Sequence, residues 1–377
     1  MDPDLARLAA LVGDVEAFAE SVWGRRPMHR SSGTTFDGLL SLRSIERLLA
    51  SAARRPTFRL VQDGATLPPD RSTRRVRMAG ASLDDVADLA KIAAAVDSGA
   101  TLVLQGLQRT TVELAELCRS VERATSHPVQ ANAYLTPPGS AGLARHHDEH
   151  DVLVLQVAGS KAWDVDDLGP LELVAGDVLY LPAGTRHSAA AQDGMSLHLS
   201  LGLLRVTWGD LVGRALSGME GLDRPLPLGY ARTGALAGEL RDVLDRLAKS
   251  LSDADAEALA ADEVERARSR RLPLPVGQLR SVLALPGLDG DSRVSRRPDH
   301  PAVLATTPDD DDRFVLRLVD RELLLPEGAR PAVAQLLAAD GPIRVGDLAG
   351  LEPHGQLVLA RRLVREGLLV VVDDERG

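Results

Sequence analysis

The sequence is poor in cysteine, lysine and aromatic residues. It contains one cysteine, Cys118, which excludes an internal disulfide framework and a cysteine-rich zinc site. Three of its 44 basic residues are lysines and 3% of its residues are aromatic, so a lysine or an aromatic ring inside a polar cluster is informative. No apolar run reaches the ~18 residues of a membrane span, and residues 1–10 lack the pattern of a secretory leader. We therefore expect a soluble, cytoplasmic protein.

The overall composition is that of a folded protein with several domains. Apolar residues make up 44% of the 377 residues and charged residues 26%, which is ordinary globular usage. At roughly 150 residues per domain, this length suggests two or three domains. The net charge is −10, so a surface that binds nucleic acid would need a local patch of positive charge on an otherwise negative protein.

The first predicted domain covers residues 1–206. Residues 82–95 begin with Ser-Leu-Asp-Asp and carry an apolar stripe, which predicts a capped helix. From Gln130 onward, short apolar runs alternate with glycine and proline, for example at Ala131–Leu135, and His198 and Ser200 share one face of a later strand. This spacing predicts an antiparallel sandwich or barrel, and therefore a protein of the α+β class.

Two further regions follow the predicted barrel. Residues 207–275 have helical apolar spacing, and residues 276–377 contain three short helical stretches, 331–339, 344–349 and 355–366, before the strand 368–372. Three helices and a hairpin predict a winged-helix-like domain. This region holds 13 arginines against 17 acidic residues, so we expect it to contact protein rather than DNA.

The segment from Gly176 to His187 carries the clearest motif. It reads Gly-Asp-Val-Leu-Tyr-Leu-Pro-Ala-Gly-Thr-Arg-His and resembles the second motif of the cupin family, whose barrels hold a metal ion. The glycines and the proline predict a turn on each side of a strand. His187 then begins the next strand.

A first metal-binding motif lies upstream at His146-His147-Asp148. Residues at positions i and i+2 share one face of a strand, so His146 and Asp148 would converge with His187. Two histidines and one carboxylate are the ligand set of non-haem iron oxygenases, which leaves three coordination positions open. A second register, His147 with Glu149, is also compatible with this spacing.

Three residues near these motifs are candidates for binding a keto acid. Lys161 follows a Gly-Ser turn, where its ammonium could bind the distal carboxylate of 2-oxoglutarate or lie in solvent. Tyr134 shares a strand face with Asn132, and its hydroxyl could reach the same carboxylate. The alternative for Asn132 and Tyr134 is core packing with satisfied hydrogen bonds.

Taken together, residues 131–148 and 154–163 resemble the JmjC-type ribosomal oxygenases, which hydroxylate ribosomal proteins with Fe(II) and 2-oxoglutarate. The N-terminal Trp23-Gly-Arg-Arg-Pro27 is similar to a segment of that family, as is Ser196–Ser200. The resemblance extends to all three regions, because the family adds a helical dimerisation region and a winged-helix domain to its barrel.

The resemblance implies a role for each candidate. His146, Asp148 and His187 would bind Fe(II), Lys161 and Tyr134 would bind the 5-carboxylate of 2-oxoglutarate, and Asn132 would lie at its 1-carboxylate end. It also implies a homodimer that hydroxylates a His or Arg side chain of a ribosomal protein and releases succinate and CO2. The alternatives are the same chemistry on a free amino acid or biosynthetic peptide, and a metal-binding cupin regulator without catalysis.

Overall fold

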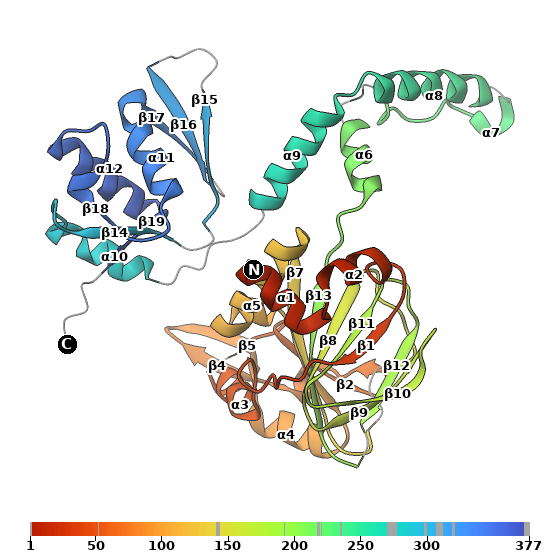
Figure 1. Ribbon diagram of the computed structural model, residues 1–377. Coiled ribbons are helices and arrows are strands. Elements are labelled where there is room, and N and C mark those ends of the chain that lie inside the picture. Colours follow the sequence, from red (N-terminus) through yellow and green to blue (C-terminus); the bar gives the residue numbers. More distant parts are fainter. Residues whose placement is uncertain are drawn as a thin grey trace. The chain divides into compact units, whose positions relative to one another are not determined.

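The computed structural model describes residues 2–51, 53–140, 144–191, 193–216, 219, 221–233, 236–269, 277–297, 300–306, 312–318 and 321–372. The chain divides into two compact units, Met1–Thr207 and Trp208–Gly377 (Figure 1). The expected boundary between residues 275 and 276 lies outside the described residues. Among the described helices, none has both the length and the apolar content to cross a membrane.

An eight-stranded sheet forms one wall of the first unit. Its strands lie in the order β1-β11-β8-β13-β7-β6-β2-β3, and neighbouring strands pair antiparallel throughout. The strands are β1 (Met28–Ser31), β2 (Phe58–Gln62), β3 (Ala65–Thr66), β6 (Thr101–Leu104), β7 (Val129–Thr136), β8 (Asp151–Ala158), β11 (Asp177–Leu181) and β13 (Ser196–Leu203).

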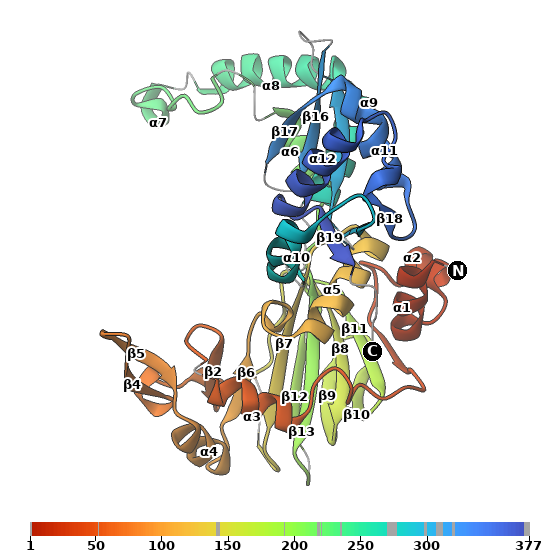
Figure 2. The same ribbon diagram turned by 90° about the vertical axis from the view of Figure 1, so that its left-hand side faces the viewer.

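A smaller sheet faces the first and completes the barrel (Figure 2). Its strands β9 (Ser160–Val165), β10 (Gly169–Val174) and β12 (His187–Ala191) lie in the order β10-β9-β12. Trp163 and Leu173 of this sheet pack in one apolar cluster with residues of β8 and β11. The antiparallel barrel predicted from the closely spaced strands is therefore present.

Helices of the first unit pack around the larger sheet. They are α1 (Pro3–Val12), α2 (Val15–Ser21), α3 (Leu42–Ala50), α4 (Leu89–Asp97) and α5 (Val112–Thr125), with short 3-10 helices at Pro69–Arg71 and Leu107–Arg109. Helix α1 is tied to α5 because the carboxylate of Asp4 accepts hydrogen bonds from Ser120 and Arg123. The thiol of Cys118 is buried in this core, and burial raises its pKa to about 12, which makes it unreactive.

The helix predicted over residues 82–95 is wrong in its first half. Residues Ala81–Ala87 form strand β5, which pairs with β4 (Thr73–Met78) in a two-stranded ribbon that stands apart from the barrel in Figure 2. The acids that suggested a helix start instead form ion pairs. Asp84 pairs with Arg75 across the ribbon, and Asp85 pairs with Arg54, which precedes β2. Helix α4 begins later, because the carboxylate of Asp88 accepts from the amides of Ala90 and Lys91.

The second unit contains four helices and then a mixed segment with its own core. The helices are α6 (Trp208–Leu216), α7 (Tyr230–Thr233), α8 (Leu236–Ser252) and α9 (Ala256–Ser269). The mixed segment consists of α10 (Gln278–Ala284), α11 (Arg330–Ala338), α12 (Pro353–Arg365) and two three-stranded sheets, of order β18-β14-β19 and β15-β16-β17. Its strands are β14 (Arg293–Arg296), β15 (Ala302–Thr306), β16 (Arg313–Leu318), β17 (Glu322–Pro326), β18 (Ile343–Arg344) and β19 (Leu369–Val372).

One predicted helix of this segment is shorter than expected. Of the stretch 344–349, a single 3-10 turn at Val345–Asp347 is formed, directly after β18. Two further 3-10 helices of this segment lie at Leu285–Gly287 and Glu327–Ala329. The helices expected at 331–339 and 355–366 and the strand at 368–372 correspond to α11, α12 and β19. Side chains from all three, such as Val333, Leu363 and Leu369, lie in one buried cluster.

The turn between β8 and β9 depends on a glycine. Gly159 has a φ of +65°, and a Cβ there would lie 1.8 Å from the carbonyl oxygen of Met195. We expect Gly159→Ala to lower the free energy of unfolding by roughly 2–4 kcal/mol, because the left-handed backbone and the overlap with a backbone atom both cost energy. Urea denaturation measures this change.

The matched control is Gly169→Ala in the turn between β9 and β10. Gly169 also has a positive φ, +74°, but nothing lies within 4 Å of its Cβ position. The Gly169→Ala change should therefore lower the free energy of unfolding only by the cost of the left-handed backbone, roughly 1–2 kcal/mol. Equal losses at both positions would show that the close approach to Met195 has no energetic weight.

Candidate metal centre

The loop that carries His146 is joined directly to strand β12. The amide of His146 donates to the carbonyl oxygen of His187 at 3.0 Å, and the amide of His187 donates back at 2.9 Å. The prediction that His146–Asp148 form a strand is wrong, since His146 makes an isolated bridge and Asp148 lies in the loop beyond it. Their side chains converge because of this bridge rather than by alternation along a strand.

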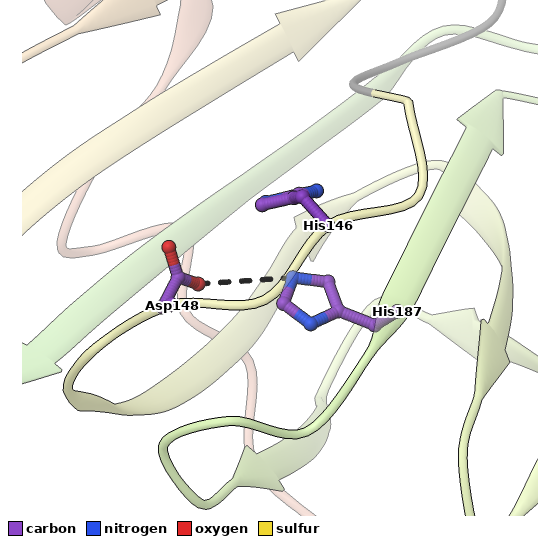
Figure 3. A group of neighbouring side chains, drawn as sticks. All are labelled: His146, Asp148 and His187. Carbon is purple, nitrogen blue, oxygen red and sulfur yellow. Dashed lines mark ion pairs between the residues drawn. The ribbon is translucent and has the colours of Figure 1, made fainter.

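The side chains of His146, Asp148 and His187 meet at one point (Figure 3). Each offers a ligand atom within 4.8 Å of the others, and Nε2 of His187 lies 3.7 Å from Oδ2 of Asp148. The Nδ1 atoms of His146 and His187 lie 2.7 Å and 3.0 Å from the carbonyl oxygens of Ala144 and Thr185. Both Nδ1 atoms donate there, which leaves Nε2 as the metal-binding nitrogen of each ring.

The second register left open by the spacing does not bring its side chains together. His147 and Glu149 are both exposed, and the ring of His150 packs against Gly202. By contrast, His187 is 5% exposed, and burial lowers its pKa, so the ring is neutral and can bind a metal. Among the described residues, the group formed by His146, Asp148 and His187 has the geometry of a metal site.

A cavity of about 300 Å³ opens beside these three side chains between the two sheets. This volume lies at the lower end of the range for small-molecule sites. Its lining comes from β2, β6, β7, β8, β9, β11, β12 and β13 as well as from the loop of His146. The lining residues are Arg59, Val61, Thr101, Tyr134, His146, Asp148, Val152, Val154, Lys161, Trp163, Leu181, His187, Ala189, His198 and Ser200.

Lys161 lies inside this cavity and not in solvent. Its side chain is 2% exposed, and its Nζ donates to the hydroxyl of Thr136 at 3.2 Å. No carboxylate of the described residues forms an ion pair with it, and burial lowers the pKa of Lys161 to about 8. The alternative of a solvent-exposed turn lysine is therefore wrong, and the ammonium is a buried cation without an anionic partner.

Tyr134 lines the cavity with Lys161. Its ring stacks on that of His198, with centroids 4.8 Å apart and planes 6° from parallel, and burial raises the pKa of the Tyr134 hydroxyl. Two buried nitrogens of other residues that line the cavity, Nδ1 of His198 and Nε1 of Trp163, have no hydrogen-bond partner among the described residues. Together with Lys161, these groups suit a ligand with oxygen atoms.

Asn132 shares the strand face of Tyr134 but does not line the cavity. Its Oδ1 accepts a hydrogen bond from the amide of Gly106 at 3.0 Å. The side chain thus holds the backbone that follows β6, and its amide nitrogen is the remaining polar group. His198 and Ser200, which share one face of β13, both line the cavity.

Arg59 is a cavity residue that sequence analysis missed. It lies on β2, beside Val103 of β6, which in turn pairs with Tyr134 of β7, so Arg59 and Tyr134 lie in one row on the same face of the sheet. Its guanidinium donates to the hydroxyl of Thr66 at 3.1 Å. The alternation of Arg59 with Phe58 and Leu60 could have indicated a face opposite to the apolar core.

Comparisons with known proteins show which proteins this fold resembles. Residues 104–172 and 169–211 match the family model described as the JmjC domain. The solved structure of YcfD, a ribosomal oxygenase from Escherichia coli in complex with cobalt and 2-oxoglutarate, aligns over 96% of this chain and 99% of that chain, with a TM-score of 0.55 and 17% identity. The fold is therefore similar to that of a solved ribosomal oxygenase, and residues 104–211 match the JmjC domain.

Parts of the chain are similar to ribosomal oxygenases and to a histidyl-hydroxylase. The chain is 30% identical over 253 residues to ribosomal oxygenase 2 of Bos taurus, which covers 55% of this chain and 53% of the relative. It is 33% identical over 145 residues to the bifunctional lysine-specific demethylase and histidyl-hydroxylase NO66 of Dictyostelium discoideum, which covers 32% of this chain and 28% of the relative. The chain thus spans about half of these relatives' length or less.

The buried charge of Lys161 predicts a change in stability. Its folded-state pKa, about 8, lies below the unfolded value of 10.5, so the charged lysine destabilises the fold by on the order of 3 kcal/mol at pH 7. This cost is complete below pH 8 and disappears as the pH rises to 10.5. We expect Lys161→Met to raise the free energy of unfolding of the ligand-free protein at pH 7, with a smaller gain at pH 10.

The control is Lys91→Met. The Nζ of Lys91 donates to the carbonyl oxygens of Asp70 and Thr73, both at 2.9 Å. Its replacement should therefore lower stability, by roughly 1 kcal/mol. Denaturation of both variants at the two pH values gives the comparison, and a loss of stability in Lys161→Met would mean that the cavity does not isolate the charge.

Proposed function

We propose that the protein is an Fe(II)- and 2-oxoglutarate-dependent oxygenase that hydroxylates a side chain of another protein. The observation that carries this proposal is the meeting of His146, Asp148 and His187 at the edge of a cavity that also holds the unpaired cation of Lys161. In the overall reaction, a substrate C–H group, dioxygen and 2-oxoglutarate give a C–OH group, succinate and CO2. One oxygen atom enters the substrate and the other enters succinate.

The donor set fits ferrous iron. Two imidazole nitrogens and one carboxylate oxygen suit Fe(II) and leave three positions open for cosubstrate and dioxygen. Iron supplies the oxidative chemistry when it is bound. The carbonyl oxygens of Ala144 and Thr185 fix the two imidazole rings, and the Asp148 carboxylate reduces the charge of the centre.

The groups that line the cavity away from the metal ligands suit the distal carboxylate of 2-oxoglutarate. Lys161 and Tyr134 would bind the 5-carboxylate, because the ammonium lacks an anion and Tyr134 lines the same cavity from the facing sheet. The unpartnered nitrogens of His198 and Trp163 offer further polar contacts there. Asn132 is proposed at the 1-carboxylate end, where only its amide nitrogen is available, since its oxygen is bonded to Gly106.

The substrate proposed is a His or Arg side chain of a ribosomal protein. Support comes from the names of the relatives, which include ribosomal oxygenases and a histidyl-hydroxylase. The reaction on a free amino acid or a biosynthetic peptide is the second candidate, and a regulator that binds metal without turnover is the third. We place the reaction in the cytoplasm because the proposed substrate is ribosomal.

The reaction is tested with the metal-loaded full chain, 2-oxoglutarate and intact ribosomal proteins. We expect a mass gain of one oxygen on one ribosomal protein, coupled to succinate, and at least a hundredfold loss of both in Asp148→Ala, because two imidazoles alone hold Fe(II) poorly. Product masses and the iron content of each variant are measured. The control Asp97→Ala changes an exposed acid on α4 and should keep full activity.

Three results separate the candidates. Succinate formed only with free amino acids or short peptides would favour the second candidate. Iron binding without any succinate would favour the regulator. Full iron occupancy in Asp148→Ala would remove Asp148 from the metal site.

We also propose that residues 207–275 form a dimer interface with a second copy. Helix α8 has no buried residue, and its leucines at positions 240, 244, 247 and 251 follow the 4-3-4 spacing of a coiled-coil seam. Leu240 and Leu244 are 51% and 54% exposed. Residues 276–377 are proposed as a winged-helix-like domain for protein contacts, because their acidic excess disfavours nucleic acid.

The dimer is tested by the double change of Leu240 and Leu244 to Glu. We expect the mass in solution to fall from two 40.2 kDa chains to one, since four buried carboxylates would face each other across the seam. Light scattering after size exclusion measures the mass. Lys249→Glu, outside the leucine seam, is the control and should stay dimeric, while a monomeric wild type would overturn the proposal.

A further inference from the structure

A buried carboxylate lies close behind the metal centre. Asp151 begins strand β8, three residues after Asp148, and is 0% exposed. It accepts hydrogen bonds from the hydroxyl of Tyr180 at 2.6 Å and from the amide of Ala183 at 2.9 Å. It also forms an ion pair with Arg205, whose Nε lies 3.2 Å from Oδ1 of Asp151. A buried charge with these partners is fixed in position.

The turn that Asp151 holds contacts two of the three candidate ligands. Ala183 lies in the turn between β11 and β12, and the next amide, that of Gly184, donates to the carbonyl oxygen of Asp148 at 2.9 Å. The same turn presents the carbonyl oxygen of Thr185 to Nδ1 of His187 at 3.0 Å. The carboxylate of Asp151 therefore determines where the backbone of Asp148 and the ring of His187 are anchored.

The network also includes the N-terminal Trp-Gly motif, for which the proposed chemistry has no role. The hydroxyl of Tyr180 accepts a hydrogen bond from the amide of Gly24 at 2.8 Å, and its ring stacks on Trp23 with centroids 6.1 Å apart. Trp23 stacks in turn on His127, whose Nδ1 accepts from the amide of Val206 at 3.0 Å. The motif thus holds the tyrosine that donates to Asp151.

From these contacts we infer that Asp151 is a positioning residue of the metal site. It acts through the turn at residues 182–185 and not by touching the metal. The inference rests on the proposed function, because it requires that His146, Asp148 and His187 bind a metal ion. Groups that orient metal ligands in this way change metal affinity by roughly 10–100-fold when they are altered.

The test is a titration of the metal-free full chain with Co(II). We expect Asp151→Asn to weaken Co(II) binding at least tenfold and to change the visible absorption of the bound ion, because the neutral amide has one accepting oxygen in place of two and loses the ion pair with Arg205. Circular dichroism and thermal unfolding of the metal-free variant establish that it is folded. A purely structural role would lower the unfolding temperature and leave the affinity and the spectrum unchanged.

Asp177→Asn is the matched control. Asp177 is also a buried aspartate, 5% exposed, at the opposite end of β11, and it bonds to the amide of Val174 and to His29. Neither partner contacts a candidate ligand, so Co(II) affinity should stay within about twofold of wild type. An equal loss in both variants would overturn the inference.

A second variant covers the case in which Asp151→Asn does not fold. Tyr180→Phe keeps the ring that packs on Phe18 and Trp23 and removes only the hydroxyl that donates to Asp151. We expect a several-fold loss of Co(II) affinity. Wild-type affinity and spectrum in every folded variant would overturn the inference alone, whereas a wild type that binds no Co(II) would overturn the proposed function and the inference with it.

Discussion

The pair of backbone hydrogen bonds between His146 and His187 is the contact on which the site depends. It joins a loop after β7 to the first residue of β12, two segments that lie far apart in the sequence. Without it, each imidazole would still be anchored to its own chain, His146 to Ala144 and His187 to Thr185, but the two rings would have no common frame. With it, their centroids are 4.4 Å apart and a single ion can contact both.

The cavity behind this bridge has a clear electrostatic character. Lys161 and Arg59 bring two positive charges into it, and Asp148 is the one carboxylate among its lining residues. A bound divalent metal would increase the excess of positive charge. An anionic guest, above all a dianion, relieves this imbalance, whereas a neutral guest leaves the buried cation of Lys161 uncompensated. The fold thus gives up stability in its empty form to favour an anionic ligand.

The parts of the site that could be predicted from sequence are those encoded locally. The segment from Gly176 to His187 defines a strand between two turns, and its spacing placed His187 correctly at the start of β12. Arg59 could not be found in this way, because its position depends on β2 lying next to β6, a pairing between distant segments. The grouping of His146 with Asp148 was predicted from strand alternation, which is the wrong reason. The bridge between His146 and His187 of β12 places this loop at the site instead.

The error at residues 82–95 has a different origin. Acids at the start of an apolar stretch favour a helix N-terminus, but the same acids can pair with arginines on a neighbouring strand, and a sequence pattern does not contain that neighbour. Asp84 has such a partner in Arg75 of β4, and Asp85 pairs with Arg54 on a separate segment, so the ribbon forms and the helix begins at Leu89 with Asp88 as its N-cap.

Spacing within the Gly176–His187 segment follows from what its residues contact. Gly176 has a φ of +95°, and a Cβ there would lie 2.8 Å from the carbonyl oxygen of Thr34, so only glycine fits where β11 begins. Four residues later, Tyr180 points inward to Asp151, and Ala183 follows at the distance that lets its amide reach the same carboxylate. One residue more or fewer between Gly176 and Tyr180 would turn the Tyr180 side chain to the other face of β11. The spacing of the segment therefore fixes a geometry in which the buried Asp151 connects β11 to the turn that presents His187.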